Sequence, residues 1–385
     1  MKKTVKLFLS VLLTVVITSC SKGNYSNMES VSIMNPDSAI NVSFEEVATD
    51  IRIVPLISDE PLDRSGEVRS YGNETFIRSA DGKYIYYFVD GQMISKLNRV
   101  GRGRGEYLSI TNYVYSPSSH TLYVHSLTDG EVLQYTVPEM RFKRSFKIEQ
   151  LTGFAEHDDS TLIARLEDKE KKESGIYFLD VNTGKTIGKL KTITGFSGVF
   201  NGKMEYYQPK HRILSEMGSK NIISEVPEKI GGKEKELYVY DFGTFGVPEK
   251  YDDISQYDIP GLMRLAQYVK EKSEVVYVGG FNCQVNKQDI SFWYRRINTE
   301  NKAEMIYYWT NGKEFKKYAG FRAAGMRFPI IPDALTDDGY VSIIEGDKDF
   351  IFDSQQELSS VTEQIKKEMS NQKLDNPVLI YYRIQ

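Results

Sequence analysis

The feature that most constrains this chain is a succession of short strand-like segments separated by tight-turn dipeptides. The segments are rich in tyrosine, phenylalanine and β-branched residues, which favour strands over helices. Asp81-Gly82, Asn311-Gly312 and Asp338-Gly339 lie between such segments and supply the positive φ angles that tight hairpins need. This unit of strand, turn and strand recurs at about 40-residue spacing, which is typical of propeller blades.

We therefore expect an all-β fold, a six-bladed β-propeller with short helical insertions. No WD or kelch signature marks the repeat, and residues 192–235 fit it poorly. A pair of β-sandwiches remains open as the structural alternative. The expected blade starts lie near Thr75, Ile110, Leu151, Met204, Val275 and Ile330.

Three segments stand outside the repeat. Residues 50–57 precede the first full unit, and we expect them to complete the last blade and close the ring. Pro260 to Lys272 and Gln355 to about Ser370 carry apolar residues at helical spacing, which predicts two short helices. We expect Ser354 to cap the second helix. Both helices are expected to be packing insertions between blades.

The start of the chain predicts export and a lipid anchor. A basic tip, an apolar run shorter than the ~20 residues of a membrane span, and small residues before Cys20 are typical of a bacterial lipoprotein signal. An ordinary secretory signal and an N-terminal transmembrane helix are the alternatives. We expect residues 1–19 to be the signal peptide, residues 20–43 the lipidated N-terminus and a flexible tether, and residues 44–385 the propeller.

Composition excludes some classes of protein. Loss of the three lysines in residues 1–19 takes the formal net charge from -4 to about -7, so no basic face predicts nucleic-acid binding. Cys283 is the one cysteine left after lipidation of Cys20, so an intrachain disulfide is not expected. We expect neither a cofactor nor a metal site, because no cysteine cluster and no metal-binding histidine spacing is present.

Several short motifs resemble those of the six-bladed β-propeller lipoproteins of Bacteroidetes. Residues 101–107 (GRGRGEY) are similar to the G-x-G-P-G-E-Y motif of that family, with Arg104 in place of the usual proline. Residues 53–56 (IVPL), 240–243 (YDFG) and 376–379 (NPVL) resemble further segments of the family, in the same order along the chain. The resemblance covers nearly all of the mature chain. It implies a six-bladed propeller and export, and it supplies no catalytic residues.

Candidate ligand-binding residues are few. The 101–105 loop lacks P-loop spacing and is interpreted mainly as a turn between blades, although Arg102 and Arg104 could hold an anion such as an acidic sugar. Trp309 lies next to a predicted turn, where it could stack on a sugar ring. Among the histidines, His125 is expected to be a core or channel residue, and His157 to lie in a solvated turn.

No catalytic set can be named from the sequence. Cys283 is expected to be a buried inert thiol, and no nucleophile elbow is present. The leading hypothesis is a lipid-anchored module that binds a glycan, a peptide or a partner protein. A glycan hydrolase or lyase acting at the channel mouth is the main alternative, and a structural component of an envelope complex is a third.

The expected location is the cell envelope, with attachment to the outer membrane through acylated Cys20. No acidic cluster follows Cys20, which favours the periplasmic leaflet, while the cell surface remains open. The lipid anchor is the only membrane attachment that the sequence predicts.

Overall fold

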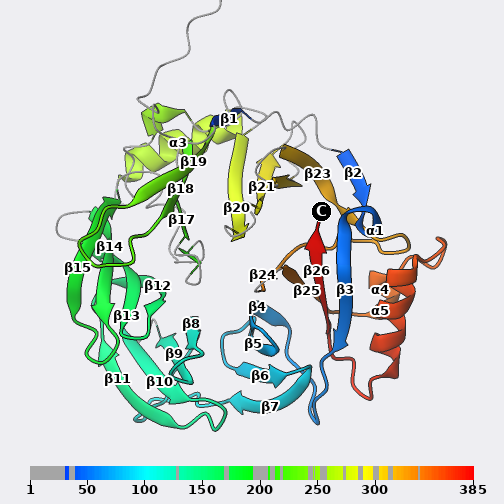
Figure 1. Cartoon of the computed structure of the whole chain (residues 1–385), viewed down its shortest axis with the longest axis horizontal. Coiled ribbons are helices and arrows are strands. Elements are labelled where there is room, and N and C mark those ends of the chain that lie inside the picture. The colour runs from blue at the N-terminus through cyan, green and yellow to red at the C-terminus, as the bar shows by residue number, and fades with distance from the viewer. Residues whose placement is uncertain are drawn as a thin grey trace, which may run out of the picture.

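The strands that the structure describes form a ring of six sheets (Figure 1). It is a computed structural model, and it describes residues 31–33, 40–126, 130–168, 173–193, 207–208, 213–216, 220–241, 246, 248–251, 258–271, 275–284, 289–297, 303–310, 315–336 and 339–385. Each sheet has four or five strands, and consecutive strands within a sheet are antiparallel neighbours. The six-bladed β-propeller predicted from the sequence is confirmed.

Blades 1 to 3 each contain four consecutive strands. Their bounds are β4 (Ser65–Tyr71), β5 (Glu74–Ser79), β6 (Ile85–Val89) and β7 (Gln92–Leu97); β8 (Ile110–Ser116), β9 (Thr121–Ser126), β10 (Glu131–Thr136) and β11 (Phe142–Lys147); and β12 (Leu151–Asp158), β13 (Thr161–Asp168), β14 (Glu173–Asp180) and β15 (Thr186–Ile193).

Blades 4 and 5 each gain a fifth, parallel strand from the N-terminal part of the chain. Their bounds are β16 (Tyr207–Gln208), β17 (Ile213–Glu216), β18 (Lys220–Glu225), β19 (Lys235–Asp241) and the added β1 (Val31–Ile33); and β20 (Val275–Gln284), β21 (Asp289–Ile297), β22 (Ala303–Thr310), β23 (Phe315–Arg322) and the added β2 (Ile40–Ser43).

The sixth blade closes the ring with a strand from the other end of the chain. It consists of β24 (Ala334–Leu335), β25 (Tyr340–Ile344), β26 (Val378–Ile384) and β3 (Ala48–Pro55). β3 pairs antiparallel with β26, and Ile53 lies opposite Ile380. The predicted closure by residues 50–57 is therefore confirmed. It covers the edge of β26, which would otherwise be left unpaired.

Two differences from the expected boundaries have physical reasons. Blade 1 begins at β4, one strand before the expected start near Thr75, because β4 alternates Glu67 and Arg69 with Val68 and so lacks an apolar signature. Within the expected tether of residues 20–43, residues 31–33 and 40–43 are strands, because they pair with the outer strands β19 and β23.

Packing between neighbouring blades forms the core. Tyrosine and phenylalanine rings fill much of this space, which accounts for their abundance in the chain. Fully buried rings include Tyr86, Tyr107, Tyr113, Tyr115, Tyr135, Tyr340, Phe44, Phe76 and Phe88.

The described part of the chain also contains short helices. They are α1 (Phe44–Val47), the 3-10 helix η4 (Glu249–Tyr251), α3 (Ile259–Glu271), α4 (Lys348–Ile351) and α5 (Ser360–Asn371). No helix in the described part of the chain has the length and apolar character that a membrane crossing requires.

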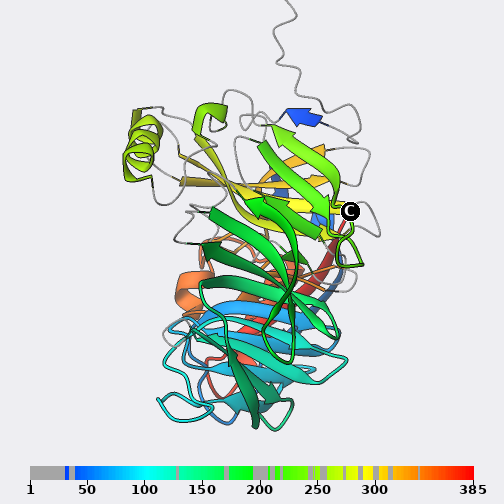
Figure 2. The ribbon, with the colours of Figure 1, turned by 90° about the vertical axis from the view of Figure 1, so that its left-hand side faces the viewer.

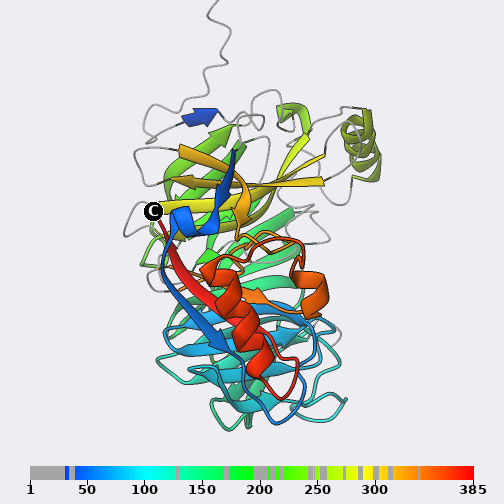
Figure 3. The same ribbon diagram turned by 90° about the vertical axis from the view of Figure 1, so that its right-hand side faces the viewer.

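α5 lies across the outer side of β3 and β26 (Figure 3), so it packs on the ring as predicted, but it is inserted between β25 and β26 within blade 6 and not between two blades. The predicted cap at Ser354 is wrong. Ser359 caps the helix by accepting a hydrogen bond from the Thr362 N–H at 3.2 Å, because Asp353 holds the preceding residues in a turn. In α3, Leu265 is buried, whereas Met263 faces away from the body.

Candidate functional site

The inner strands of blades 1 to 3 carry a cluster of polar side chains. β4 and β8 are the innermost strands of blades 1 and 2 in Figure 1, and β12 is the first strand of the next blade. Side chains alternate along a strand, so Glu67 and Arg69 of β4 share the face that is turned towards blade 2. Two neighbouring blades thus hold charged groups against one another near the ring centre.

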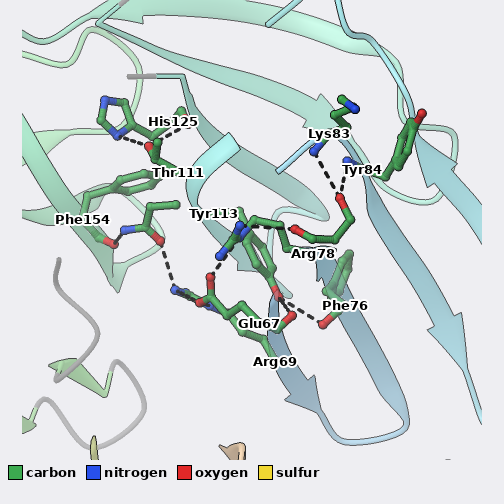
Figure 4. Close-up of polar contacts among 12 residues, drawn as sticks. Glu67, Arg69, Phe76, Arg78, Lys83, Tyr84, Thr111, Tyr113, His125 and Phe154 are labelled. Carbon is green, nitrogen blue, oxygen red and sulfur yellow. Dashed lines mark hydrogen bonds and ion pairs between the residues drawn. The ribbon is translucent and has the colours of Figure 1, made fainter. Parts of the chain in front are cut away.

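Glu67 forms ion pairs with two arginines (Figure 4). Its Oε1 accepts a hydrogen bond from Arg69 Nε at 2.8 Å and lies 2.8 Å from Arg69 Nη2, and its Oε2 lies 3.4 Å from Arg78 Nε. The exposed fractions of the side chains are 21% for Glu67, 20% for Arg69 and 11% for Arg78. The three charges are therefore largely withdrawn from water, where charge-assisted bonds are stronger than at the surface.

Asn112 extends this cluster across a third blade. Arg69 Nη2 donates to Asn112 Oδ1 at 3.1 Å, and Asn112 Nδ2 donates to the Phe154 carbonyl oxygen at 3.0 Å. The Tyr113 ring lies 4.8 Å from the Arg69 guanidinium carbon, a cation–π distance. Its hydroxyl donates to the Phe76 carbonyl oxygen at 3.0 Å. Blades 1, 2 and 3 are thus joined near the axis by one polar network.

The network carries an excess of positive charge. Burial acts to lower the pKa of Arg69, but the Glu67 carboxylate overcomes this effect, so the pKa is raised above its ordinary value. Arg69 is therefore always protonated, and one carboxylate faces two guanidinium groups within the trio of Glu67, Arg69 and Arg78.

Tyr71 lies further along the same face of β4, and Glu156 of β12 is near enough to interact with it electrostatically. Burial raises the pKa of Tyr71, although the Arg69 charge opposes this effect. Burial also raises the pKa of Glu156 to about 7, although a hydrogen bond from Ser116 acts to lower it. Glu156 therefore changes charge near neutral pH, which is unusual for a carboxyl group.

His125 is a neutral core residue. It is 1% exposed, and burial lowers its pKa to about 4. Thr111 Oγ1 lies 3.2 Å from the His125 carbonyl oxygen, to which it can donate, and 3.1 Å from Nδ1. In the part of the chain that is described, Nε2 is buried without a hydrogen-bond partner. The core position predicted from the sequence is confirmed.

The structure places Arg102 and Arg104 away from this network, on the connection from β7 to β8. Both side chains are exposed. Glu106 Oε2 accepts the Gly103 N–H at 2.7 Å, and a Cβ on Gly101 would lie 2.0 Å from that oxygen. The Glu106 carboxylate thus occupies the position in the loop where an anion could otherwise bind. Binding by the two arginines remains a prediction.

The remaining predicted residues are dispersed or undescribed. Trp309 lies in β22 and Cys283 in β20, but their side chains are outside the described part. Cys20 also lies outside the described residues. His157 is 7% exposed, in contrast to the predicted solvated turn, because its ring packs on Phe178 at 5.0 Å.

The inner-strand network was not recognised from the sequence. The available signal was the i, i+2 spacing of Glu67 and Arg69 around Val68, which indicates a strand with one charged face. Asn112 carries no comparable signal, because its role depends on neighbouring blades.

Comparisons with known proteins support the architecture. A family model described as a six-bladed beta-propeller matches residues 22–255. A solved protein of Bacteroides fragilis, described as a "putative exported protein", is 14% identical, with coverage of 90% of this chain and 98% of that chain and a TM-score of 0.61. A DUF4221 family member from Bacteroides vulgatus is 11% identical, with coverage of 88% and 98% and a TM-score of 0.49. No curated protein matches the sequence.

Proposed function

This chain belongs to a family of six-bladed β-propellers, and from that premise we propose that it is a lipid-anchored binding module of the cell envelope. The proposed ligand is a glycan, a peptide or a partner protein that presents a carboxylate or another anionic group. Its site is the inner-strand network, defined as Glu67, Arg69, Arg78, Asn112 and Tyr113. Propellers suit this role because a rigid ring supports the groups around its axis.

The observation that carries the proposal is the unbalanced charge of that network. Arg69 and Arg78 share the single carboxylate of Glu67, and all three side chains are at least about four-fifths buried. A partly desolvated excess cation is stabilised by an anion, and a guanidinium fork suits carboxylate oxygens. Asn112 and Tyr113 fix Arg69, so little side-chain freedom is lost on binding.

Attachment through Cys20 is the second part of the proposal. It is supported by the sequence pattern before Cys20, and a B. fragilis protein of similar fold is described as a putative exported protein. Mass spectrometry of the full chain purified from membranes tests it directly. A Cys20→Ala variant that is still recovered as an acylated membrane protein would contradict this part.

Ligand panels test the binding site. Mature protein is screened against acidic and neutral glycans and against peptides, and hits are measured by calorimetry at two salt concentrations. An Arg69→Gln variant should lose about tenfold or more in affinity for an anionic hit, since one charge-assisted contact contributes roughly 1.5–3 kcal/mol. Arg144→Gln is the matched control: Arg144 also donates to an amide oxygen, Gln134 Oε1 at 2.9 Å, but it lies on the outermost strand β11.

Equal loss in both variants, or binding only of neutral ligands, would refute the assignment of the site. A ligand that binds equally well at both salt concentrations would also argue against an ionic site, because partly exposed charges are screened by salt.

A second candidate function is favoured by Glu156. A carboxyl group with a pKa of about 7 can donate a proton at neutral pH, as a general acid in glycan hydrolysis or lyase chemistry must do. If mature protein cleaves any polysaccharide, Glu156→Gln should abolish turnover and leave binding intact. Retained turnover in that variant would remove Glu156 from the chemistry.

A further inference from the structure

Helix α3 is an amphipathic helix with an uncovered apolar side. It lies in the connection between blades 4 and 5, and Asp258 Oδ1 accepts the Gly261 N–H at 3.0 Å at its start. Leu265 is 2% exposed and faces the protein, whereas Ile259 and Met263, one turn apart, are 59% and 68% exposed. Met263 is the most exposed large apolar side chain in the described part of the chain.

The helix stands out from the ring. Figures 2 and 3 show α3 projecting beyond one face of the disc, at the same end of the molecule as β1. A flat surface laid across that end would meet both elements. The helix is attached to the body by Tyr268, whose ring packs on Tyr251 of η4 at 5.3 Å.

Tyrosine rings and a basic group pack the body-facing side of the helix, and a second basic group is exposed. Lys250 Nζ lies 5.0 Å from the Tyr251 ring and 5.8 Å from the Tyr268 ring, and the Arg264 side chain is 65% exposed. An exposed basic side chain on a helix that also exposes aliphatic groups is typical of interfacial helices. The acidic groups on these elements are Glu249, Asp258 and Glu271, and Asp258 lies 3.8 Å from Arg264.

The reach of the chain from its proposed anchor fits this surface. Ten residues separate Cys20 from Val31, the first residue of β1. An extended chain from Cys20 to Val31 spans roughly 40 Å at most, so an acylated Cys20 would keep this end of the propeller close to the bilayer.

We propose that α3 lies on the membrane to which the chain is anchored, with Ile259 and Met263 inserted among the lipid headgroups and upper acyl chains. The inference rests on the proposed lipid anchor. Two aliphatic side chains give weak binding by themselves, but tethering raises the local concentration of the helix at the bilayer to the millimolar range. The propeller would then stand on its rim at a fixed orientation, with its axis accessible from the side.

The test attaches the protein to vesicles without its natural lipid. Residues 21–385, which include every described strand, carry an N-terminal hexahistidine and bind nickel-chelating lipids in phosphatidylethanolamine and phosphatidylglycerol vesicles. Cys283→Ser removes the remaining thiol, and Met263→Cys carries an environment-sensitive dye. Ile94→Cys is the matched control, because Ile94 is 50% exposed on β7 at the opposite end of the ring (Figure 1).

We expect a blue shift for the Met263 dye on tethering, and quenching by bilayer-embedded quenchers that exceeds that of the Ile94 dye by about fivefold or more. An Ile259→Ser change should reduce both signals at Met263. Equal signals at the two positions, or none at Met263, would overturn the inference.

A separate measurement distinguishes failure of the proposed lipid anchor from failure of the proposed membrane contact. Mass spectrometry of the full chain reports acylation of Cys20, whereas the vesicle experiment supplies its own tether. An unacylated Cys20 with a shifted Met263 dye would refute the anchor and retain the lipid affinity of α3. An acylated Cys20 with an unshifted dye would refute the contact alone.

Discussion

Replacing Glu67 by glutamine should destabilise the propeller and make its stability dependent on anions. Glutamine has almost the same shape as glutamate but removes the single carboxylate between Arg69 and Arg78. Its amide oxygen can still accept from Arg69, but its NH2 group then faces Arg78 Nε, which is also a donor. Two guanidinium groups are left without a counter-charge.

The expected size of the effect follows from burial. Removing one partner of a fully buried ion pair costs roughly 3–5 kcal/mol, because the remaining charge is uncompensated. About a fifth of the Glu67 and Arg69 side chains is exposed, so water screens part of this cost, and we expect a loss of about 2–3 kcal/mol. In a chain of this size, such a loss lowers the melting temperature by about 3–4 °C.

Urea denaturation and thermal melting in low-salt buffer measure this loss. Adding acetate or a uronic acid should restore part of the stability of Glu67→Gln, since a bound carboxylate replaces the missing charge. A Glu67→Gln, Arg78→Gln double variant should be less destabilised than the two single changes added together. Stability within about 0.5 kcal/mol of the wild type, with no response to anions, would refute the charge argument.

Three further predictions concern other parts of the ring. The folded-state pKa of Glu156, about 7, lies above its ordinary value of 4.5, so the wild type should lose stability as the pH rises from about 4.5 to 7. In Glu156→Gln this pH-dependent loss of stability should be smaller by about 2 kcal/mol, because glutamine does not ionise. Melting temperatures measured across this pH range test the prediction. Gly105 has φ +71°, and a Cβ there would lie 2.4 Å from Phe142 Cγ, so Gly105→Ala should lower the free energy of unfolding, measured by urea titration, by about 2–4 kcal/mol. Gly72 has φ +65° but lies in open space, so Gly72→Ala should lower it by only about 1 kcal/mol. Equal losses in the two variants would contradict the steric argument. Deletion of residues 1–57 removes β3 and exposes the edge of β26, so size-exclusion chromatography should show oligomers or aggregates, and a stable monomer would contradict the closure argument.

Much of the fold could be predicted because its signals are local. The expected starts near Ile110, Leu151 and Val275 coincide with the first residues of β8, β12 and β20. Turn dipeptides and aromatic strands specify each hairpin within a few residues of chain, so no long-range information is needed. The start of blade 1 was misplaced for the converse reason: the strand nearest the axis carries charges, and burial by neighbouring blades is not visible in its own sequence.

The candidate site depends on contacts between blades. Arg69 and Asn112 are 43 residues apart, and Asn112 and Phe154 are 42 residues apart, so each contact spans about one blade of chain. The repeat length indicates which strands become neighbours. It does not specify which polar residues on those strands meet, because that depends on the register and twist with which each blade packs on the next.

The sequence by itself thus determined the all-β repeat and the closing strand, because each arises from alternation and turn chemistry within a short stretch. Only the tertiary structure decided that Glu67 lies between two arginines, that His157 is buried, and that Met263 is exposed on α3. These properties depend on what packs against each side chain. In a ring, the packing partner comes from another blade, and its register is fixed only when the ring closes.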